Sequence, residues 1–326
     1  MTIREAKRPG ALALVAAIAL GACSGSGASP SEAASEAPAD LAGTVTIDGS
    51  STVYPITEAV AEEFQAANNG VQVSAAFSGT GGGFKLFCVG DTDINDASRP
   101  IKAEDEGEGL ACAAGNIEYV ELQVAIDGLT VVVNPENTFA TCLTVEELAR
   151  IYGPDSPSGF LWSDVRADFP AEAVNRFMPG PDSGTFDYFT EVINGEVDAA
   201  TQDASVSEDD NQLVTGVAGD VNAIGFFGYA YFVENSDKVT AVEVDGGDGC
   251  IAPTDETINT NSYQPLSRPL FIYPDIGKAK ERAELKAFVD FYLDNSQTLS
   301  SEVGYVALPD DILQAEKDEW AAAVGG

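Results

Sequence analysis

The sequence predicts an α/β protein of two lobes of comparable size, the first built on a mostly parallel β-sheet with helices on its faces. Short runs with apolar residues at alternate positions are followed by runs with apolar residues at helical spacing, and this succession recurs along the chain. The chain has 326 residues, of which 44% are apolar, and this is enough for two self-sufficient cores.

The first part of the chain alternates strand and helix patterns. Strand patterns cover 44–50, 71–77 and 92–101, and helix patterns cover 55–68 and 78–88. In the segment 55–68, Ile56, Val60 and Phe64 lie at helical spacing. A glycine-rich turn opens the segment 78–88, and the strand in 92–101 runs into a loop.

The second part continues the alternation. Strand patterns cover 127–137, 173–180, 223–232 and 265–274, and helix patterns cover 144–153, 181–193, 207–220 and 281–295. Thr144 and Glu147 have the spacing of a capping box at the start of their helix. The segment 281–295 is amphipathic, and its apolar face consists of Leu285, Phe288, Val289, Tyr292 and Leu293.

Residues 1–22 are expected to be a lipoprotein signal peptide and not part of the fold. Three basic residues precede an apolar run from Ala11 to Leu20, which is too short to cross a bilayer as a helix. The run ends in Leu-Gly-Ala-Cys, which resembles the lipobox of bacterial lipoproteins. We therefore expect lipidation of Cys23 and an exported protein anchored at the cell membrane, on its extracytoplasmic face or in the periplasm. An ordinary secretory signal, cleaved after a small residue, is the alternative.

Residues 23–40 are predicted to form a flexible tether. From Ser24 to Asp40 the chain is rich in Ser, Ala, Gly and Pro and has no large apolar residue. Such a segment cannot bury enough apolar surface to fold. The folded part is therefore expected to begin near Leu41.

The charge and the missing histidines exclude several classes of function. The chain has 53 acidic and 16 basic residues, a net charge of -37 and no histidine. Nucleic acid and anionic lipid headgroups are not expected as partners, because both need a basic surface. Without histidine, Ser-His-Asp and Cys-His catalysis are excluded and a transition-metal site is disfavoured. We expect no metal and no cofactor.

Three turns have the same composition, and each lies before a helix pattern. They read GSSTVYP at 49–55, SGTGGGFK at 78–85 and PDSGTF at 181–186. Each turn alone is typical of a helix N-cap. Together they predict a ligand site, because strand-to-helix junctions of an α/β sheet lie on one edge. Their glycines permit close approach, and their hydroxyl and N–H groups can donate to an anion.

A nucleotide-hydrolysing P-loop is not predicted, although the second turn is rich in glycine. Lys85 follows Phe84 where a Walker motif needs glycine, and no Ser or Thr follows the lysine. The cation near the three turns is Arg99, beside Ser98. Its planar guanidinium suits an oxyanion, so we expect Arg99 in the site, and a surface salt bridge is the alternative.

Four cysteines remain when Cys23 is assigned to lipid. They are Cys88, Cys112, Cys142 and Cys250. An even number in an exported chain predicts two disulfides, and the spacing alone leaves all three pairings open.

From about Thr44 onward the chain resembles the substrate-binding lipoproteins of phosphate ABC transporters, the PstS type. The resemblance rests on seven motifs in order: GSSTVYP, SGTGGGFK, ASRPI, LTVEELARIYG, DSGTF, AIGFFGYAY and YVALPD. It implies a two-lobed class II periplasmic-binding-protein fold, with inorganic phosphate bound in the cleft between the lobes and closure by a hinge. It also implies ABC transporter permease subunits as partners.

The resemblance further implies how the chain divides. Lobe I is expected to comprise 41–127 plus 267–326, and lobe II 128–266, with crossings near 125–129 and 266–271. Two cysteines then fall in each lobe, which favours the pairs Cys88–Cys112 and Cys142–Cys250.

The family's binding residues fall on three turns of this sequence and on one loop. They are Ser51, Thr52 and Val53 in the first turn, Thr80 in the second, and Ser183, Gly184 and Thr185 in the third. The family's acidic residue falls on Ser98, and its arginine before the third turn falls on Pro179. We therefore expect Arg99 to replace the cation and Asp182 to accept the proton of phosphate. Asp209 and Asp210 are weaker candidates for the acceptor.

The predicted function is high-affinity binding of inorganic phosphate, without chemistry, and its delivery to a permease. A carboxylate acceptor would separate phosphate from sulfate, because only phosphate still carries a proton at neutral pH. Three alternatives stay open: the same scaffold binding another oxyanion such as sulfate or molybdate, an exported phosphatase, and a structural cell-surface lipoprotein.

Overall fold

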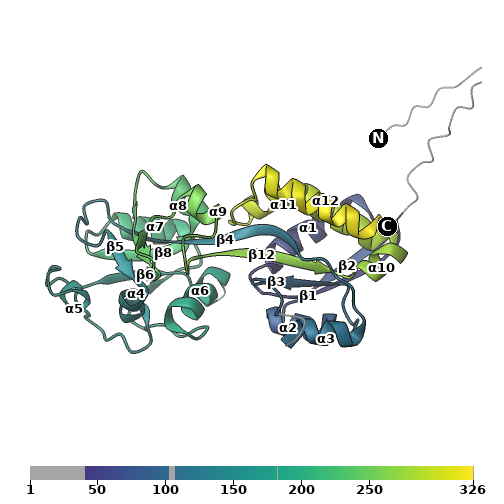
Figure 1. Cartoon of the computed structure of the whole chain (residues 1–326). Coiled ribbons are helices and arrows are strands. Elements are labelled where there is room, and N and C mark those ends of the chain that lie inside the picture. The colour runs from purple at the N-terminus through teal and green to yellow at the C-terminus, as the bar shows by residue number, and fades with distance from the viewer. Residues whose placement is uncertain (1–40, 103–106, 182, 326) are drawn as a thin grey trace, which may run out of the picture. The chain divides into compact units, whose positions relative to one another are not determined.

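The computed structural model describes residues 41–102, 107–181 and 183–325 (Figure 1). The predicted signal peptide, the predicted tether and the lipidation residue Cys23 therefore lie outside the described residues, and so does Asp182.

The described chain alternates strands and helices as predicted. The strands are β1 (Gly43–Gly49), β2 (Val71–Ala75), β3 (Ile94–Ala97), β4 (Leu122–Val133), β5 (Cys142–Thr144), β6 (Asn175–Met178), β7 (Ser205–Val206), β8 (Ala223–Gly228), β9 (Thr240–Ala241), β10 (Glu243–Asp245), β11 (Cys250–Ile251) and β12 (Ser267–Pro274). The helices are α1 (Tyr54–Ala67), α2 (Thr80–Phe87), α3 (Gly107–Gly115), α4 (Val145–Tyr152), α5 (Trp162–Val165), α6 (Gly184–Phe189), the π-helix η1 (Thr190–Asn194), α7 (Asp210–Ala218), α8 (Tyr229–Glu234), α9 (Asp255–Asn259), α10 (Ile276–Glu281), α11 (Ala283–Glu302) and α12 (Asp310–Val324).

The main sheet is parallel at its two ends and antiparallel in its middle. Its strand order is β2-β1-β3-β12-β4-β8-β6-β7, and β9 also pairs with β4. β1 pairs in parallel with β2 and β3, as predicted for the first lobe, and β6 pairs in parallel with β7 and β8. The long strands β4 and β12 are antiparallel to each other and to their outer neighbours, so the sheet as a whole is mixed.

β4 changes partner part-way along its length. It pairs with β12 from Leu122 to Gly128 and with β8 from Leu129 to Val133. Figure 1 shows β4 and β12 running together from the elements around β1 to the elements around β8. One continuous strand thus belongs to both halves of the sheet, and its change of partner falls between Gly128 and Leu129.

Aromatic side chains fill the cores on both sides of this crossing. The predicted amphipathic helix is α11, and the residues of its predicted apolar face are buried. Phe64 of α1 packs edge-on against Phe288 of α11, with ring centroids 5.3 Å apart. In the other half, the rings of Phe189 and Phe226 stack at 3.8 Å. The first contact joins α1 to α11, and the second holds α6 against β8.

The strand predicted over 223–232 is wrong in its second half. β8 ends at Gly228, and Tyr229 to Glu234 form the helix α8. A continuous apolar and aromatic run does not by itself distinguish a buried strand from a buried helix. In the structure Tyr229 is buried and its hydroxyl donates to Asp255 at 2.7 Å, a contact made from the first residue of the helix.

Both disulfides have the pairing that the family resemblance implied. Cys88 bonds to Cys112, joining the end of α2 to α3, and Cys142 bonds to Cys250, joining β5 to β11 across 108 positions of sequence. β5 and β11 flank β10 in a separate three-stranded sheet.

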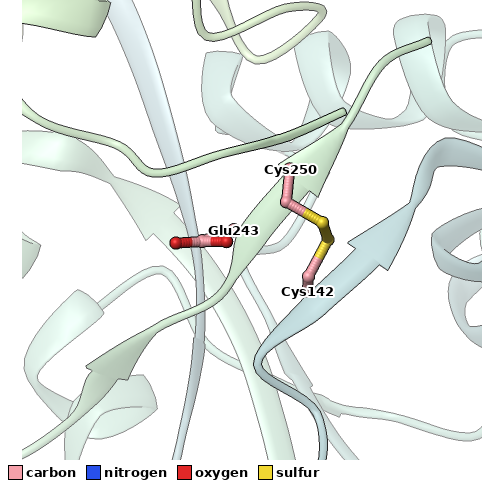
Figure 2. A group of neighbouring side chains, drawn as sticks. All are labelled: Cys142, Glu243 and Cys250. Carbon is pink, nitrogen blue, oxygen red and sulfur yellow. A yellow bond between two sulfur atoms is a disulfide. The ribbon is translucent and has the colours of Figure 1, made fainter. Parts of the chain in front are cut away.

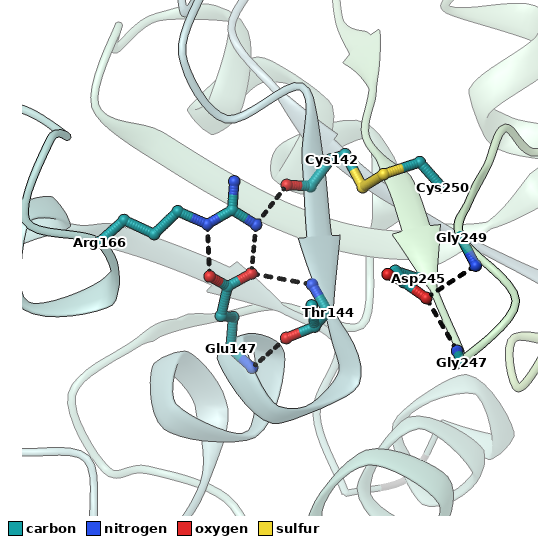
Figure 3. Close-up of a disulfide and its surroundings, with 8 residues drawn as sticks. All are labelled: Cys142, Thr144, Glu147, Arg166, Asp245, Gly247, Gly249 and Cys250. Carbon is teal, nitrogen blue, oxygen red and sulfur yellow. Dashed lines mark hydrogen bonds and ion pairs between the residues drawn. A yellow bond between two sulfur atoms is a disulfide. The ribbon is translucent and has the colours of Figure 1, made fainter.

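The second disulfide lies within a network of hydrogen bonds (Figure 3). The Arg166 guanidinium donates to the Cys142 carbonyl at 3.0 Å and to Glu147 at 2.6 Å. Glu147 and Thr144 form the predicted capping box of α4. On the β11 side, Asp245 accepts the N–H groups of two glycines in the turn before Cys250. The cross-link therefore joins two backbone segments that are already held in place.

Candidate functional site

A cavity of about 580 Å³ lies where the first two predicted turns meet α6, η1 and the start of β12. Its lining consists of Ser50, Ser51, Thr52, Gly79, Thr80, Gly81, Ser98, Arg99, Asp187, Tyr188, Glu191, Val192, Val197, Asn261, Gln264, Pro265, Ser267 and Arg268. The first two turns and the loop after β3 thus contribute hydroxyl groups, glycines and Arg99, whereas α6 and η1 contribute Asp187, Tyr188 and Glu191. The crossing strand β12 contributes Ser267 and Arg268.

Five of the predicted site residues line this cavity: Ser51, Thr52, Thr80, Ser98 and Arg99. The sixth from the same half, Val53, is buried and is the N-cap residue of α1. In the described part of the chain, the N–H groups of Ser51 and Val53 have no hydrogen-bond acceptor. Both donors are therefore available to an anion at the start of α1.

The second turn is tied to the end of β3. The Thr80 hydroxyl accepts the Ser98 N–H at 3.1 Å and shares a hydrogen bond of 3.2 Å with the Ser98 hydroxyl. Gly79, the N-cap residue of α2, has a φ of 79°, a conformation that favours glycine. Two residues that sequence analysis placed in the site, Thr80 and Ser98, thus contact each other.

The described residues of the third turn adjoin the cavity but do not line it. Ser183 is the N-cap residue of α6, and its side chain makes no capping hydrogen bond. A Cβ placed on Gly184 would lie 3.7 Å from the Cα of Thr52, so the first and third turns meet. Thr185 lies in the first turn of α6 and is likewise absent from the lining.

Neither of the weaker acceptor candidates lines the cavity. Asp209 is the N-cap residue of α7, and its carboxylate accepts the Asn211 N–H at 3.0 Å. Asp210 begins the same helix, and burial raises its pKa to about 6. A capping role accounts for Asp209 without a ligand.

Arg268 is the main candidate site residue that sequence analysis missed; it lines the cavity. Its Nε lies 3.2 Å from Asp127, its Nη2 donates to the Thr52 hydroxyl at 2.8 Å, and its guanidinium stacks 3.6 Å above the Tyr188 ring. Its Nη1 lies 3.6 Å from Glu191. The side chain is only 14% exposed, so these contacts fix a guanidinium in the cavity wall where water screens it weakly.

Arg99 lies in the cavity as predicted, but its charge is already paired. Its Nη2 contacts Glu108 of α3 at 2.8 Å, and its Nη1 donates to the Pro100 carbonyl at 3.1 Å. Its side chain is 37% exposed, against 14% for Arg268. Of the two cations in the lining, Arg268 is therefore the one better placed to hold an anion.

Among the described residues, the carboxylates of Asp187 and Glu191 also line the cavity. The pKa of Asp187 is raised, first by burial and then by the nearby charge of Asp198, although Arg268 acts in the opposite direction. A carboxylate with a raised pKa binds a proton more tightly and is a stronger hydrogen-bond acceptor. Asp187 immediately follows the predicted third turn, which ends at Phe186.

One signal in the sequence could have identified Arg268. Sequence analysis places the two crossings near 125–129 and 266–271, and each of these apolar segments contains one charged residue, Asp127 and Arg268 respectively. The two residues are direct partners in the β4–β12 register. An opposite charge in each crossing strand indicates a buried pair at the hinge.

The described residues contain one group with the spacing of a metal site: Cys142, Glu243 and Cys250 (Figure 2). Figure 2 shows that both sulfurs belong to the disulfide, with the Glu243 carboxylate beside it. Sulfur in a disulfide is no thiolate ligand, so this group carries no metal chemistry in the oxidised protein.

The family follows from comparison with known proteins. The sequence profile of the PBP superfamily domain matches residues 34–296. This chain belongs to the PBP superfamily. The predicted two-lobed class II periplasmic-binding-protein fold and the resemblance to PstS-type proteins are thereby confirmed.

Three PBP relatives show how far the similarity extends. Protein SphX of Synechocystis sp. is 48% identical over 84% of this chain and 81% of its own length. Phosphate-binding protein PstS of Staphylococcus aureus (strain USA300) is 37% identical over 97% of this chain and 92% of its own. The crystal structure of a possible phosphate binding protein from Planctomyces limnophilus superimposes with a TM-score of 0.83 at 47% identity, over 87% of this chain and 99% of that one.

No helix within 41–102, 107–181 and 183–325 has both the length and the apolar character needed to cross a bilayer.

Proposed function

We propose that this chain binds inorganic phosphate in the cavity, carries out no chemistry on it, and delivers it to an ABC transporter permease. The observation that carries the proposal is the geometry of Arg268, which Asp127 orients, Tyr188 covers and Thr52 contacts in the cavity wall. The names of the relative PstS and of the Planctomyces protein support the ligand class.

The contacts of Arg268 also prepare the hydroxyl of Thr52 as a donor. Because the Thr52 oxygen accepts a hydrogen bond from Arg268, its own proton is free to point toward an anion. The free N–H groups of Ser51 and Val53 add backbone donors at the start of α1. Fixed donors of this kind stabilise a multiply charged oxyanion without needing a basic protein surface, which explains how a chain of net charge -37 could bind phosphate.

Asp187 is our proposed acceptor for the proton of phosphate. It lines the cavity, and its raised pKa makes it a strong acceptor. Asp182, the acceptor predicted from sequence, lies outside the described residues and stays a prediction.

Calorimetric titration with phosphate and sulfate tests the ligand and the acceptor together. We expect the natural protein to bind phosphate at least about 100-fold more tightly than sulfate, because a carboxylate repels a fully ionised anion. Asp187→Asn should narrow that ratio by about tenfold or more. Asp182→Asn is the matched comparison, and a larger loss of selectivity there would assign the acceptor to Asp182. Tighter binding of sulfate by the natural protein would overturn the proposed ligand.

We propose that closure of two lobes encloses the anion, with lobe I formed by 41–127 plus 267–326 and lobe II by 128–266. The change of partner in β4 between Gly128 and Leu129 supports this division. Both crossing strands carry one member of the Asp127–Arg268 pair, so the anion would bind at the hinge itself.

We propose that the mature protein is exported and anchored by lipid on Cys23. The sequence of the first 23 residues supports this assignment, and these residues lie outside the described part. Cys23→Ser, expressed with the natural signal, is expected to move the protein from the membrane fraction to the soluble extracytoplasmic fraction. A variant that still sediments with membranes would contradict lipid anchoring at this residue.

A further inference from the structure

Tyr305 lies in a short segment that pairs with the crossing strand β4. The segment Gly304–Val306 follows α11, and Val306 and Ile126 exchange two backbone hydrogen bonds of 2.9 Å. Ile126 immediately precedes Asp127, the partner of Arg268. A third piece of backbone is therefore fixed next to β4 at the hinge, and it belongs to the YVALPD motif of the sequence.

The side chain of Tyr305 reaches the place where the first and third turns meet. A Cβ placed on Gly184 would lie 3.6 Å from the Tyr305 Oη and 3.7 Å from the Thr52 Cα. The hydroxyl and the first turn therefore both lie within 4 Å of one point at the edge of the cavity. Tyr305 and Gly184 are not in the cavity lining, but Thr52 is.

The surroundings of Tyr305 keep its hydroxyl protonated. Burial raises the pKa of Tyr305, the charges of Asp127 and Asp187 raise it further, and Arg268 acts in the opposite direction. A protonated hydroxyl is a donor. Within the described part of the chain, this hydroxyl makes no hydrogen bond, although its backbone N–H donates to Ser300 at 2.9 Å.

We propose that Tyr305 is a further phosphate-binding residue, whose hydroxyl donates a hydrogen bond to an oxygen of the bound anion. The inference rests on the proposed function, since phosphate supplies the acceptor that the hydroxyl lacks. A tyrosine hydroxyl on a segment fixed to β4 adds a neutral donor beside the point where the first and third turns meet. This donor adds binding strength without adding charge, and it can donate to an oxygen of phosphate or of sulfate equally well.

Tyr305→Phe tests the inference because it removes only the hydroxyl. We expect the Kd for phosphate to rise by about tenfold, as for loss of one hydrogen bond to a charged group, with the melting temperature of the protein without phosphate nearly unchanged. The matched control is Tyr231→Phe, because the Tyr231 ring lies against the same segment, 3.5 Å from a Cβ placed on Gly304. We expect the Kd of the Tyr231→Phe variant for phosphate to stay within about twofold of that of the natural protein.

Selectivity separates this role from that of the acceptor. Loss of a neutral donor should weaken phosphate and sulfate by similar factors, whereas Asp187→Asn should change the ratio between them. An unchanged Kd for Tyr305→Phe in a protein that binds phosphate would overturn the inference and leave the proposed function standing. A lowered melting temperature with an unchanged Kd would make Tyr305 structural only. Failure of the natural protein to bind phosphate would instead overturn the proposed function.

Discussion

Arg268→Ala is expected to raise the Kd for phosphate by at least about 100-fold. Arg268 is a cation with a side chain only 14% exposed, whose guanidinium is fixed by Asp127 and Tyr188 and contacts Thr52 in the cavity wall. Truncating one member of a buried, hydrogen-bonded charge pair typically costs about 2–5 kcal/mol of binding free energy, and each 1.4 kcal/mol is about tenfold in Kd. Calorimetric titration with phosphate measures the change.

The same substitution should destabilise the protein, because it leaves the Asp127 carboxylate buried without its partner. Burial already raises the pKa of Asp127 in the presence of Arg268, and an unpaired buried charge costs about 3–5 kcal/mol. The double variant Arg268→Ala with Asp127→Asn removes both charges. We expect it to recover most of the stability in urea unfolding and none of the phosphate affinity.

Two further variants show what Arg268 contributes. Arg268→Lys keeps the charge but loses the planar fork and the stacking on Tyr188, so an intermediate affinity is expected. Arg99→Ala should weaken binding less than Arg268→Ala, because Glu108 already pairs with Arg99 and its side chain is 37% exposed. If the double variant folds and binds phosphate as tightly as the natural protein, the anion is not held by Arg268.

Asp96→Asn is expected to flatten the dependence of stability on pH. Asp96 lies in β3 and is 1% exposed; one of its carboxylate oxygens accepts the Thr57 hydroxyl at 2.8 Å. The other oxygen has no partner within the described residues. Burial, with a smaller effect of Asp48, raises the pKa of Asp96 from 3.8 to about 8. The native protein therefore holds this group as a neutral acid at pH 7.

The sign of the effect follows from the difference in bound protons. Between pH 4 and pH 8 the folded protein keeps the proton on Asp96, whereas the unfolded chain loses it. Raising the pH through this window therefore lowers the free energy of unfolding by up to about 1.4 kcal/mol per pH unit. The stability that the proton on Asp96 contributes is fully present below about pH 4 and is lost above about pH 8.

Urea unfolding at pH 5 and pH 7 measures the effect. From pH 5 to pH 7, the free energy of unfolding of the natural protein should fall by about 2–3 kcal/mol more than that of the Asp96→Asn variant. The pKa of Asp210 is raised to about 6 and that of Glu316 to about 7, so both titrate in or near the same window. The difference between the two proteins, and not the slope of either one, therefore reports Asp96. Equal losses in both proteins would show that Asp96 is ionised in the native state.

The turns of the site could be predicted from sequence because their signals are local. Ser51, Thr52 and Thr80 lie in short runs of Ser, Thr and Gly before helix patterns, and chain order alone places them at one edge of the sheet. The cysteine pairs followed from the family's division into lobes. The turns were thus predicted from residues that are near in sequence, and the cysteine pairs from the lobe division that the family resemblance implies.

The position of Arg268 in the cavity and the pairing of Arg99 with Glu108 could not be predicted, because both depend on contacts that local sequence does not encode. Arg268 meets Asp127 across 141 positions of sequence, through the register of two antiparallel strands. Glu108 belongs to α3, a short helix rich in Gly and Ala with no clear periodic pattern, which sequence analysis did not predict. Arg99 as the cation of the site stays a prediction, and the low exposure of Arg268, which only the tertiary structure provides, adds a second candidate.

The continuous strand β4 has a consequence for the order of events in binding. When two bodies turn about a hinge, atoms close to the axis move least and atoms at the rim move most. Arg268 pairs with Asp127, one position before the partner change at Gly128 and Leu129, so its guanidinium should keep its place in open and closed forms alike. Capture of the anion would then come before closure. The rate of association would be set by a preformed arginine, and the rate of release by the reopening of the lobes.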